Sequence, residues 1–198
     1  VIIMLSLLTQ GGYDSVGRAA MDASFTVVSY MSTAGFAICD NSMWPWTAGV
    51  ILLFVSFQCG CSGSTTGCIK VDRILIAFKA IGHEIRHRLH PSEISHVRMS
   101  GQHLSDGSVK AVMMYIVTYF LLTFMSIIIV MLCGETATEA VSGVIASIGS
   151  VGPGLGELGS MDNYSAQAAV SKFVYTADMF LGRVEIYPIL VVVSTMFR

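Results

Sequence analysis

Charged side chains are scarce in this sequence. Asp, Glu, Lys and Arg make up only 12% of its 198 residues, whereas soluble globular domains carry about 25%. Hydrophobic residues make up 54% of the chain. This balance excludes an ordinary water-soluble domain and predicts a protein that lies in a membrane.

Several signatures of chemistry and processing are missing as well. Residues 60–67 contain neither the Gly-Lys-Ser/Thr of a phosphate-binding loop nor the G-x-S-x-G of a serine nucleophile. The five cysteines include no C-x-x-C pair and no paired zinc spacing, which favours small buried hydrophobic residues over disulfides or thiolate ligands. Residues 1–8 lack the basic region and cleavage site of a secretory signal, so we interpret them as the end of a helix.

One uncharged stretch, residues 111–133, is long enough as a helix to cross a hydrocarbon core of about 30 Å. Most of the basic residues precede it in the middle of the chain: Lys70, Arg73, Lys79, Arg86, Arg88, Arg98 and Lys110. The positive-inside rule makes this region cytoplasmic. Acidic residues then lie outside, where they either concentrate cations or only solvate the loops: Asp14, Asp40, Glu135, Glu157 and Asp162.

Two segments, 24–36 and 141–153, repeat one pattern. Each is a short amphipathic stretch, and they run into Thr33-Ala34-Gly35-Phe36-Ala37 and Ser150-Val151-Gly152-Pro153-Gly154. Backbone carbonyls can replace the water shell of a cation where side chains leave room, so a central Gly and a hydroxyl residue at the inner end are typical of an ion filter. The predicted filter residues are Thr33, Ala34, Gly35, Phe36, Ser150, Val151, Gly152, Pro153 and Gly154.

A second repeat extends this organisation, since residues 67–75 match residues 182–190 in class and spacing. We expect two units, each made of an outer helix, a re-entrant pore loop and an inner helix. They comprise residues 1–81 and 109–198, joined by a basic cytoplasmic loop at 82–108.

The re-entrant segments are expected at residues 18–36 and 136–149, and an inward crossing helix at 166–197. Irregular backbone at membrane depth is tolerated only where protein or a water-filled cavity surrounds it. Because four such loops normally surround one axis, the chain must dimerise or be half of a longer protein.

These motifs resemble the TrkH, TrkG and KtrB potassium uptake subunits, which are related to the plant HKT transporters. The most specific element is Gly60-Cys61-Ser62-Gly63-Ser64-Thr65-Thr66-Gly67-Cys68-Ile69-Lys70, which is similar to the family's Gly-rich segment in its third repeat. Residues 150–156 and 178–185 are similar to the fourth filter loop and the helix that follows. The resemblance implies an all-α integral membrane protein with four repeats, of which this chain holds the third and fourth.

The resemblance also implies a gate beneath the filter. Its residues are Gly60, Ser62, Gly63, Ser64, Thr65, Thr66 and Gly67, together with Arg183. This sequence departs from the family pattern at Cys59, Thr66 and Cys68, where Gly is usual, so its loop is less flexible. Two interpretations of Arg183 remain: it projects into the pore cavity, or it pairs internally with Asp178 or Glu185.

Partners and cargo follow from the same resemblance. It implies K⁺ as the transported ion, no cofactor, a multi-pass protein of the bacterial inner membrane, and a homodimer of full-length subunits. A cytosolic ring of nucleotide-binding subunits of the TrkA or KtrA type would regulate it, and the basic region would contact that ring or anionic lipid. Nucleic acid is not expected, because the basic residues are tied to a membrane boundary.

Two other functions stay open at this point. The chain could be a potassium channel with two pore loops that is completed by dimerisation. Alternatively, His83-Glu84-Ile85-Arg86-His87 has the H-E-x-x-H spacing of a zinc metalloprotease, with Glu84 as the general base. No downstream pattern identifies a third zinc ligand, so we expect no zinc site and no enzyme activity.

Overall fold

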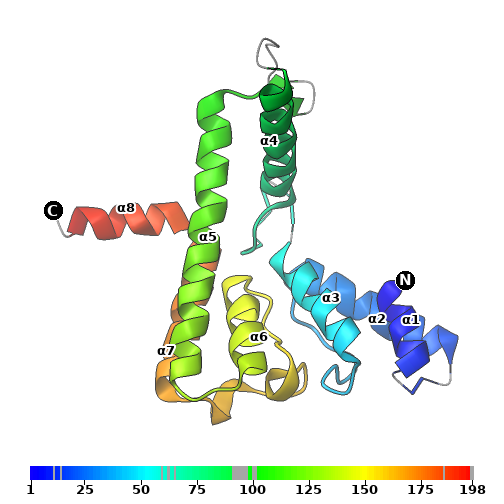
Figure 1. Cartoon of the computed structure of the whole chain (residues 1–198). Coiled ribbons are helices and arrows are strands. Elements are labelled where there is room, and N and C mark those ends of the chain that lie inside the picture. Colours follow the sequence, from blue (N-terminus) through cyan, green and yellow to red (C-terminus); the bar gives the residue numbers. More distant parts are fainter. Residues whose placement is uncertain are drawn as a thin grey trace.

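The computed structural model describes residues 1–10, 12–13, 15–58, 60–61, 63–64, 66–90, 98–99, 102–184 and 186–196. The chain is mostly helical, as the sequence predicts (Figure 1). The helices are α1 (Ile2–Gln10), α2 (Val16–Met31), α3 (Trp46–Phe57), α4 (Val71–Leu89), α5 (Asp106–Leu132), α6 (Ala137–Ile148), α7 (Ala169–Val184) and α8 (Ile186–Met196). Two 3₁₀ turns, η1 (Gly156–Leu158) and η2 (Tyr164–Ala166), and a two-residue hairpin, β1 (Arg98–Met99) with β2 (Gln102–His103), complete it. The hairpin was not predicted.

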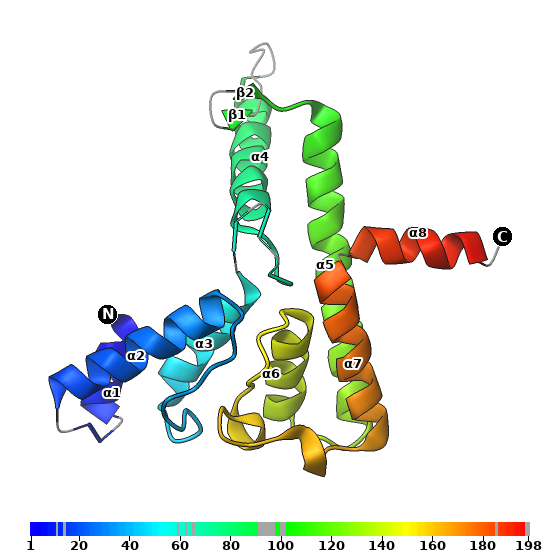
Figure 2. The ribbon, with the colours of Figure 1, turned by 180° about the vertical axis from the view of Figure 1, so that it is seen from behind.

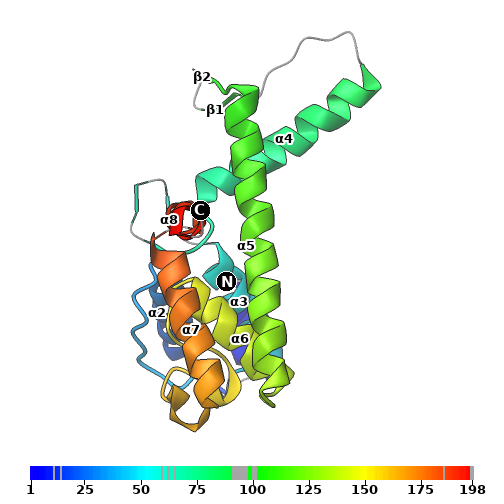
Figure 3. The same cartoon turned by 90° about the vertical axis from the view of Figure 1, so that its left-hand side faces the viewer.

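The helices form two packed groups. Helices α1, α2 and α3 contact one another, and α5, α6 and α7 form the second group, while α3 also contacts α6. Figure 2 shows the two groups side by side, with α4 above the first group and α5 of the second group extending up beside α4. In Figure 3, α6 lies between α5 and α7, and α4 leaves both groups at an angle.

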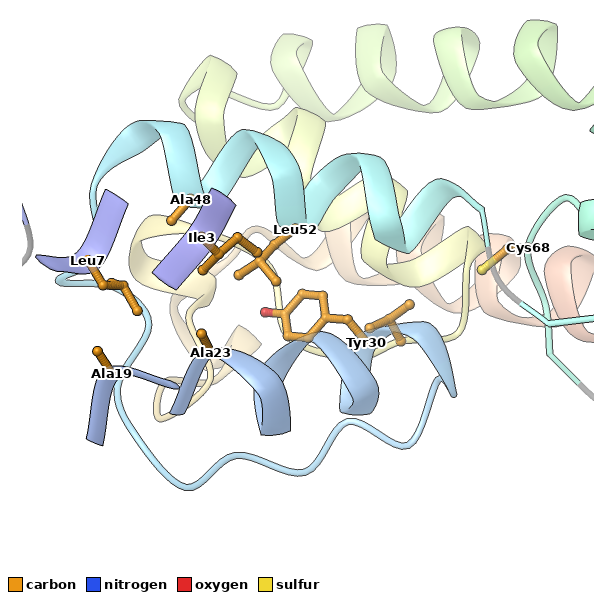
Figure 4. Close-up of a cluster of buried hydrophobic side chains, with 9 residues drawn as sticks. Ile3, Leu7, Ala19, Ala23, Tyr30, Ala48, Leu52 and Cys68 are labelled. Carbon is orange, nitrogen blue, oxygen red and sulfur yellow. The ribbon is translucent and has the colours of Figure 1, made fainter. Parts of the chain in front are cut away.

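The core of the first group forms where three helices meet. Side chains from α1, α2 and α3, including Ile3, Tyr30 and Leu52, pack together between the ribbons (Figure 4). Val151 and Cys68 belong to the same buried cluster, although they come from the second filter segment and the Gly-rich segment. The core therefore reaches both predicted functional segments.

Helix α5 has the length and composition of a membrane span. Within the described part of the chain it is the one helix that is long and apolar enough to cross a bilayer. It begins at Asp106, earlier than predicted, because the Ser105 side chain caps it by accepting a hydrogen bond from the Ser108 amide. Helices α3 and α6 are also apolar, but at 12 residues each they are too short to span.

Helix α4 extends beyond the predicted boundary of the basic loop. The sequence places residues 82–108 in a loop, whereas α4 continues to Leu89. Its last turn carries Arg86, His87 and Arg88, and positive charge there is favoured by the partial negative charge at a helix C-terminus.

The predicted crossing helix at 166–197 is wrong, because the structure divides it into α7 and α8. Helix α7 ends at Val184, and α8 leaves in a different direction (Figure 1). Pro188 explains the position of the break. In a continuous helix its ring would clash with the carbonyl of Val184, four residues earlier, and it has no amide hydrogen to donate there.

Candidate filter and gate

The first filter loop begins where α2 ends. The Thr33 amide donates a hydrogen bond to the Tyr30 carbonyl at 3.1 Å, and the Ala34 amide donates to the Ser29 carbonyl at 2.9 Å. These bonds turn the backbone amides back toward the helix. They also satisfy carbonyls that the end of α2 would otherwise leave without partners.

The second filter loop begins in the same way at the end of α6. The Ser150 amide donates to the Ser147 carbonyl at 2.9 Å, and the Val151 amide donates to the Ala146 carbonyl at 2.9 Å. The sequence separation of donor and acceptor is the same as in the first loop. The two segments therefore share a local hydrogen-bond pattern as well as a sequence pattern.

Backbone conformation is also alike in the two loops. Thr33 has φ +54° and Ser150 has φ +53°, and these are the only non-glycine residues with positive φ in the described ranges. The central glycines follow two positions later, with φ +72° at Gly35 and φ +103° at Gly152. Left-handed conformations are costly for residues with a side chain, so their matched placement marks two specialised loops.

Several carbonyls of these loops have no hydrogen-bond donor. Among the described residues, none donates to the carbonyl oxygens of Thr33, Ala34, Gly35, Ser150 or Val151. The preceding amides are already bonded to the helix ends. Both loops therefore present oxygen acceptors, which are the ligands that a hydrated cation requires when it loses water.

Two other carbonyls of the predicted filter are held by side chains. The Ser29 hydroxyl donates to the Phe36 carbonyl at 2.7 Å, and the Tyr164 hydroxyl donates to the Gly152 carbonyl at 2.8 Å. Burial raises the pKa of Tyr164 to about 12, so its hydroxyl keeps its proton at neutral pH. The sequence did not identify Ser29 or Tyr164, because neither residue belongs to a recognisable motif.

The two loops touch each other. A Cβ added to Gly35 would lie 2.7 Å from the Val151 carbonyl oxygen, so only glycine fits there. A Cβ added to Gly152 would meet nothing within 4 Å. One central glycine is thus enclosed by the neighbouring loop, and the other faces open space.

The Gly-rich segment lies against the start of the second loop. A Cβ on Gly67 would lie 2.8 Å from the Ser150 hydroxyl oxygen, which is buried and has no hydrogen-bond partner in the described structure. The Cys68 thiol donates to the carbonyls of Ser56 at 2.9 Å and Gly149 at 3.3 Å. Cys68 therefore links the Gly-rich segment to α3 and to the start of the second loop.

Within the described part of the predicted gate, hydrogen bonds join residues of the Gly-rich segment to one another and to the start of α4. The Val71 amide donates to the Gly60 carbonyl at 3.1 Å, and the Ser64 hydroxyl donates to the Thr66 hydroxyl at 3.0 Å. A side chain at Gly60 would overlap that of Thr66. Cys59, Ser62 and Thr65 lie outside the described residues, and Gly63 is exposed with φ +86°.

Arg183 occupies the last turn of α7 and has an exposed side chain. It does not pair with Asp178, whose carboxylate accepts a hydrogen bond from the Ser126 hydroxyl at 2.8 Å. Glu185, the other predicted partner, lies outside the described residues. The structure thus removes one of the two internal pairs that the sequence allows.

The H-E-x-x-H residues lie on one side of α4. The rings of His83 and His87 stack with their centroids 6.4 Å apart. Glu84, the predicted general base, pairs with Arg88 at 3.0 Å. Among the described residues, no three His, Cys, Asp or Glu side chains lie close enough together to hold a metal ion.

Known proteins share this arrangement of helices and loops. The model of the TrkH family of cation transport proteins matches residues 12–197. The chain belongs to the TrkH family. This membership confirms the resemblance found in the sequence, and it confirms that the chain is not an enzyme, because the family consists of membrane transport proteins.

The TrkH relatives are bacterial. The potassium uptake protein TrkH of Salmonella typhimurium is 33% identical over 197 residues, which cover 100% of this chain and 40% of that protein. TrkI of Halomonas elongata is 34% identical over 175 residues, covering 88% of this chain and 36% of TrkI. The crystal structure of the potassium transporter TrkH from Vibrio parahaemolyticus superimposes with a TM-score of 0.86 at 32% identity, covering 96% of this chain and 40% of that one. This chain therefore spans about two fifths of the length of these relatives.

Proposed function

We propose that this chain supplies two of four filter loops through which a TrkH-type protein moves potassium ions across the bacterial inner membrane. The observation that carries this proposal is the pair of touching loops whose carbonyls at Thr33, Ala34, Gly35, Ser150 and Val151 accept no hydrogen bond from any described residue. The relatives named above are potassium uptake proteins.

The ion would exchange its water for these carbonyl oxygens. The buried Ser150 hydroxyl and the equivalent Thr33 hydroxyl would contribute at the inner end of the filter. Helices α2 and α6 end at the loops, so the partial negative charge at their C-termini adds to the attraction for a cation. The two units correspond to the third and fourth repeats of the family.

The gate proposal combines the Gly-rich segment 60–67 with Arg183. The contact of Gly67 with Ser150 supports this proposal, because a shift of the segment at the inner end of the proposed filter would open or block the ion path. The exposed position of Arg183 is compatible with a cavity beneath the filter, where a fixed positive charge would raise the barrier to cations.

Assembly completes the pathway. We propose a homodimer of full-length subunits, each with four loops, and a TrkA- or KtrA-type ring of nucleotide-binding subunits on the cytoplasmic side. The basic end of α4 and residues 82–108 are the proposed docking surface, and anionic lipid is the competing partner. A channel completed by dimerisation of two such chains is the second candidate, since the open side of Gly152 could face a second copy.

The test is rubidium uptake, with sodium competition, by potassium-starved cells that express the full reading frame. Gly152→Asp places a carboxylate in the filter. Gly134→Asp is a matched control, because Gly134 also has positive φ, at +96°, and open space around it, but it lies in the loop after α5.

We expect Gly152→Asp to abolish uptake and Gly134→Asp to retain it, at equal abundance in the membrane. Retained potassium selectivity in Gly152→Asp would contradict the assignment of the filter. Loss of uptake in both variants at equal abundance would show that the effect is not specific to the filter.

A further inference from the structure

Asp178 is a buried carboxyl group with no role in the filter or the gate. It lies on α7, and its side chain is only 2% exposed. The buried side of α7 consists of Ser171, Tyr175, Asp178 and Gly182, and this helix packs against α5 and α6. An acidic residue in such a place needs compensation, because burying a charge is costly.

Only one oxygen of this carboxyl group has a partner. Oδ1 accepts the hydrogen bond from the Ser126 hydroxyl on α5. Oδ2 is fully buried and has no hydrogen-bond partner within the described structure. Because this chain already encloses Oδ2, a further subunit could reach it only by opening the contact between α5 and α7.

No basic side chain from the packed helices compensates for a charge there. Burial and the hydrogen bond from Ser126 define the electrostatic environment of the Asp178 carboxyl group, and no cation among the described residues contributes to it. The neighbouring titratable groups on its side are Tyr175, and beyond it Tyr164, Glu135 and Glu139, which are neutral or negative. Helix α8 contains no Asp, Glu, His, Lys or Arg, and Lys172 on α7 donates to the Ser165 carbonyl.

A bound proton would neutralise the buried charge of Asp178. An ionised carboxylate would leave a buried charge with a single donor, at a cost of several kcal/mol. In the protonated form Oδ1–H can donate to the Ser126 hydroxyl oxygen, and Oδ2 becomes a neutral carbonyl oxygen. A neutral acceptor without a partner costs less than a charged one. Binding adds one proton and removes one negative charge, with no other reactant.

We propose that Asp178 is a proton-binding site and that its bound proton keeps α7 packed against α5 and α6. Gly182, one turn further along α7, contacts the Ile148 carbonyl at the end of α6, just before Ser150. Release of the proton would therefore loosen the support of the second filter loop.

Infrared spectroscopy of the purified full-length protein tests the proton directly, without any assumption about transport. On the acid side of the titration of Asp178, the wild type should show the carbonyl band of its protonated carboxylic acid and should lose that band as the pH rises, and Asp178→Asn should lack it at every pH. Asp162→Asn is the matched control, since Asp162 is exposed in the outer loop, and it should keep the band. Identical spectra for the wild type and Asp178→Asn would overturn the proposal.

If Asp178→Asn does not fold, a second variant can test the proposal. Ser126→Ala removes the one hydrogen bond to the carboxyl group, so the band of a protonated Asp178 should shift while the carboxyl stays neutral. An unshifted band, with Asp178→Asn absent from the membrane, would overturn the proposal.

The pH dependence of rubidium uptake supplies a functional readout that rests on the proposed function. Wild-type uptake should fall by about tenfold for each pH unit above the titration of Asp178, because only the protonated form is packed. Asp178→Asn should lack this alkaline loss, whereas Asp162→Asn should retain it. A persistent alkaline loss in Asp178→Asn would contradict the link to transport, and the infrared result would stand separately.

Discussion

The two central glycines, Gly35 and Gly152, differ in the atoms that surround them. Gly35 combines a positive φ with a neighbouring carbonyl oxygen that excludes a Cβ, while Gly152 has the positive φ alone. The contact at Gly35 joins loops that are far apart in the sequence. A methyl group at this position therefore tests whether the two loops form one unit.

We expect Gly35→Ala to lower the stability of the protein and to reduce rubidium uptake. The left-handed conformation alone costs about 1–2 kcal/mol for a residue with a side chain, and displacement of the Val151 carbonyl adds to it. Thermal unfolding in detergent and uptake measure the two effects. Gly82→Ala is the control: this residue lies in α4 with open space around it, and the change should be neutral or stabilising.

Tyr164→Phe removes one hydroxyl that holds the Gly152 carbonyl. A net hydrogen bond contributes about 0.5–1.5 kcal/mol, so we expect rubidium selectivity over sodium to fall by about fivefold. Tyr13→Phe, which removes a bond of the same length to Asp22 outside the filter, should leave selectivity unchanged. Because burial raises the pKa of Tyr164 to about 12, its contribution should persist below that pH and be lost only above it. Competition assays across pH check both points.

Helices α2 and α6, which precede the two predicted filter loops, differ at their N-termini. Helix α6 starts with a complete capping box, in which the Thr136 side chain accepts from the Glu139 amide and the Glu139 carboxylate accepts from the Thr136 amide. Helix α2 follows Ser15, whose side chain makes no capping bond. Although the loops that follow α2 and α6 are alike, only α6 has its N-terminus held by a side-chain capping bond.

Thr136→Ala should therefore destabilise the protein by about 1 kcal/mol, as loss of an N-cap usually does. Ser15→Ala should have little effect, because no capping bond is lost. Chemical denaturation of the two variants in detergent measures the difference. Equal losses would show that the capping box does not hold α6.

The contact between α6 and α7 depends on Gly182. A Cβ there would overlap the Ile148 carbonyl oxygen, so Gly182→Ala must push the helices apart. Overpacking of this kind costs about 1–3 kcal/mol. We expect a lower unfolding temperature and reduced uptake, whereas the same change at Gly107, where only the Ser105 hydroxyl comes within 4 Å, should be tolerated. An unchanged α6–α7 packing in Gly182→Ala would contradict the close approach.

For the whole molecule, the number of loops decides function. This chain brings the two predicted filter loops into contact, and a filter with four loops would need two more. Expressed by itself, the chain should therefore give no rubidium uptake, and co-expression with a chain that supplies the other two loops should restore it. Uptake by the short chain, together with dimers detected by cross-linking, would instead favour the channel completed by dimerisation.

Local sequence patterns predict much of this molecule. Low charge indicated the membrane, the uncharged stretch predicted α5, and the Thr or Ser followed two positions later by Gly predicted both loops. These features depend on neighbours a few residues apart, which a sequence displays directly. The break between α7 and α8 has an equally local cause in Pro188, although the prediction of one continuous helix overlooked it.

Contacts between segments that are far apart in the chain could not be predicted from the sequence. The approach of Gly35 to Val151, the hydroxyl of Tyr164 on the Gly152 carbonyl and the enclosed Oδ2 of Asp178 all result from how the helices pack. Composition and periodicity indicate which residues a helix can bury, but they do not predict which atoms come into contact between packed helices and loops. The sequence alone therefore predicted a membrane chain with two filter-like loops, and tertiary packing decided that these loops touch and that Asp178 is buried beside Ser126.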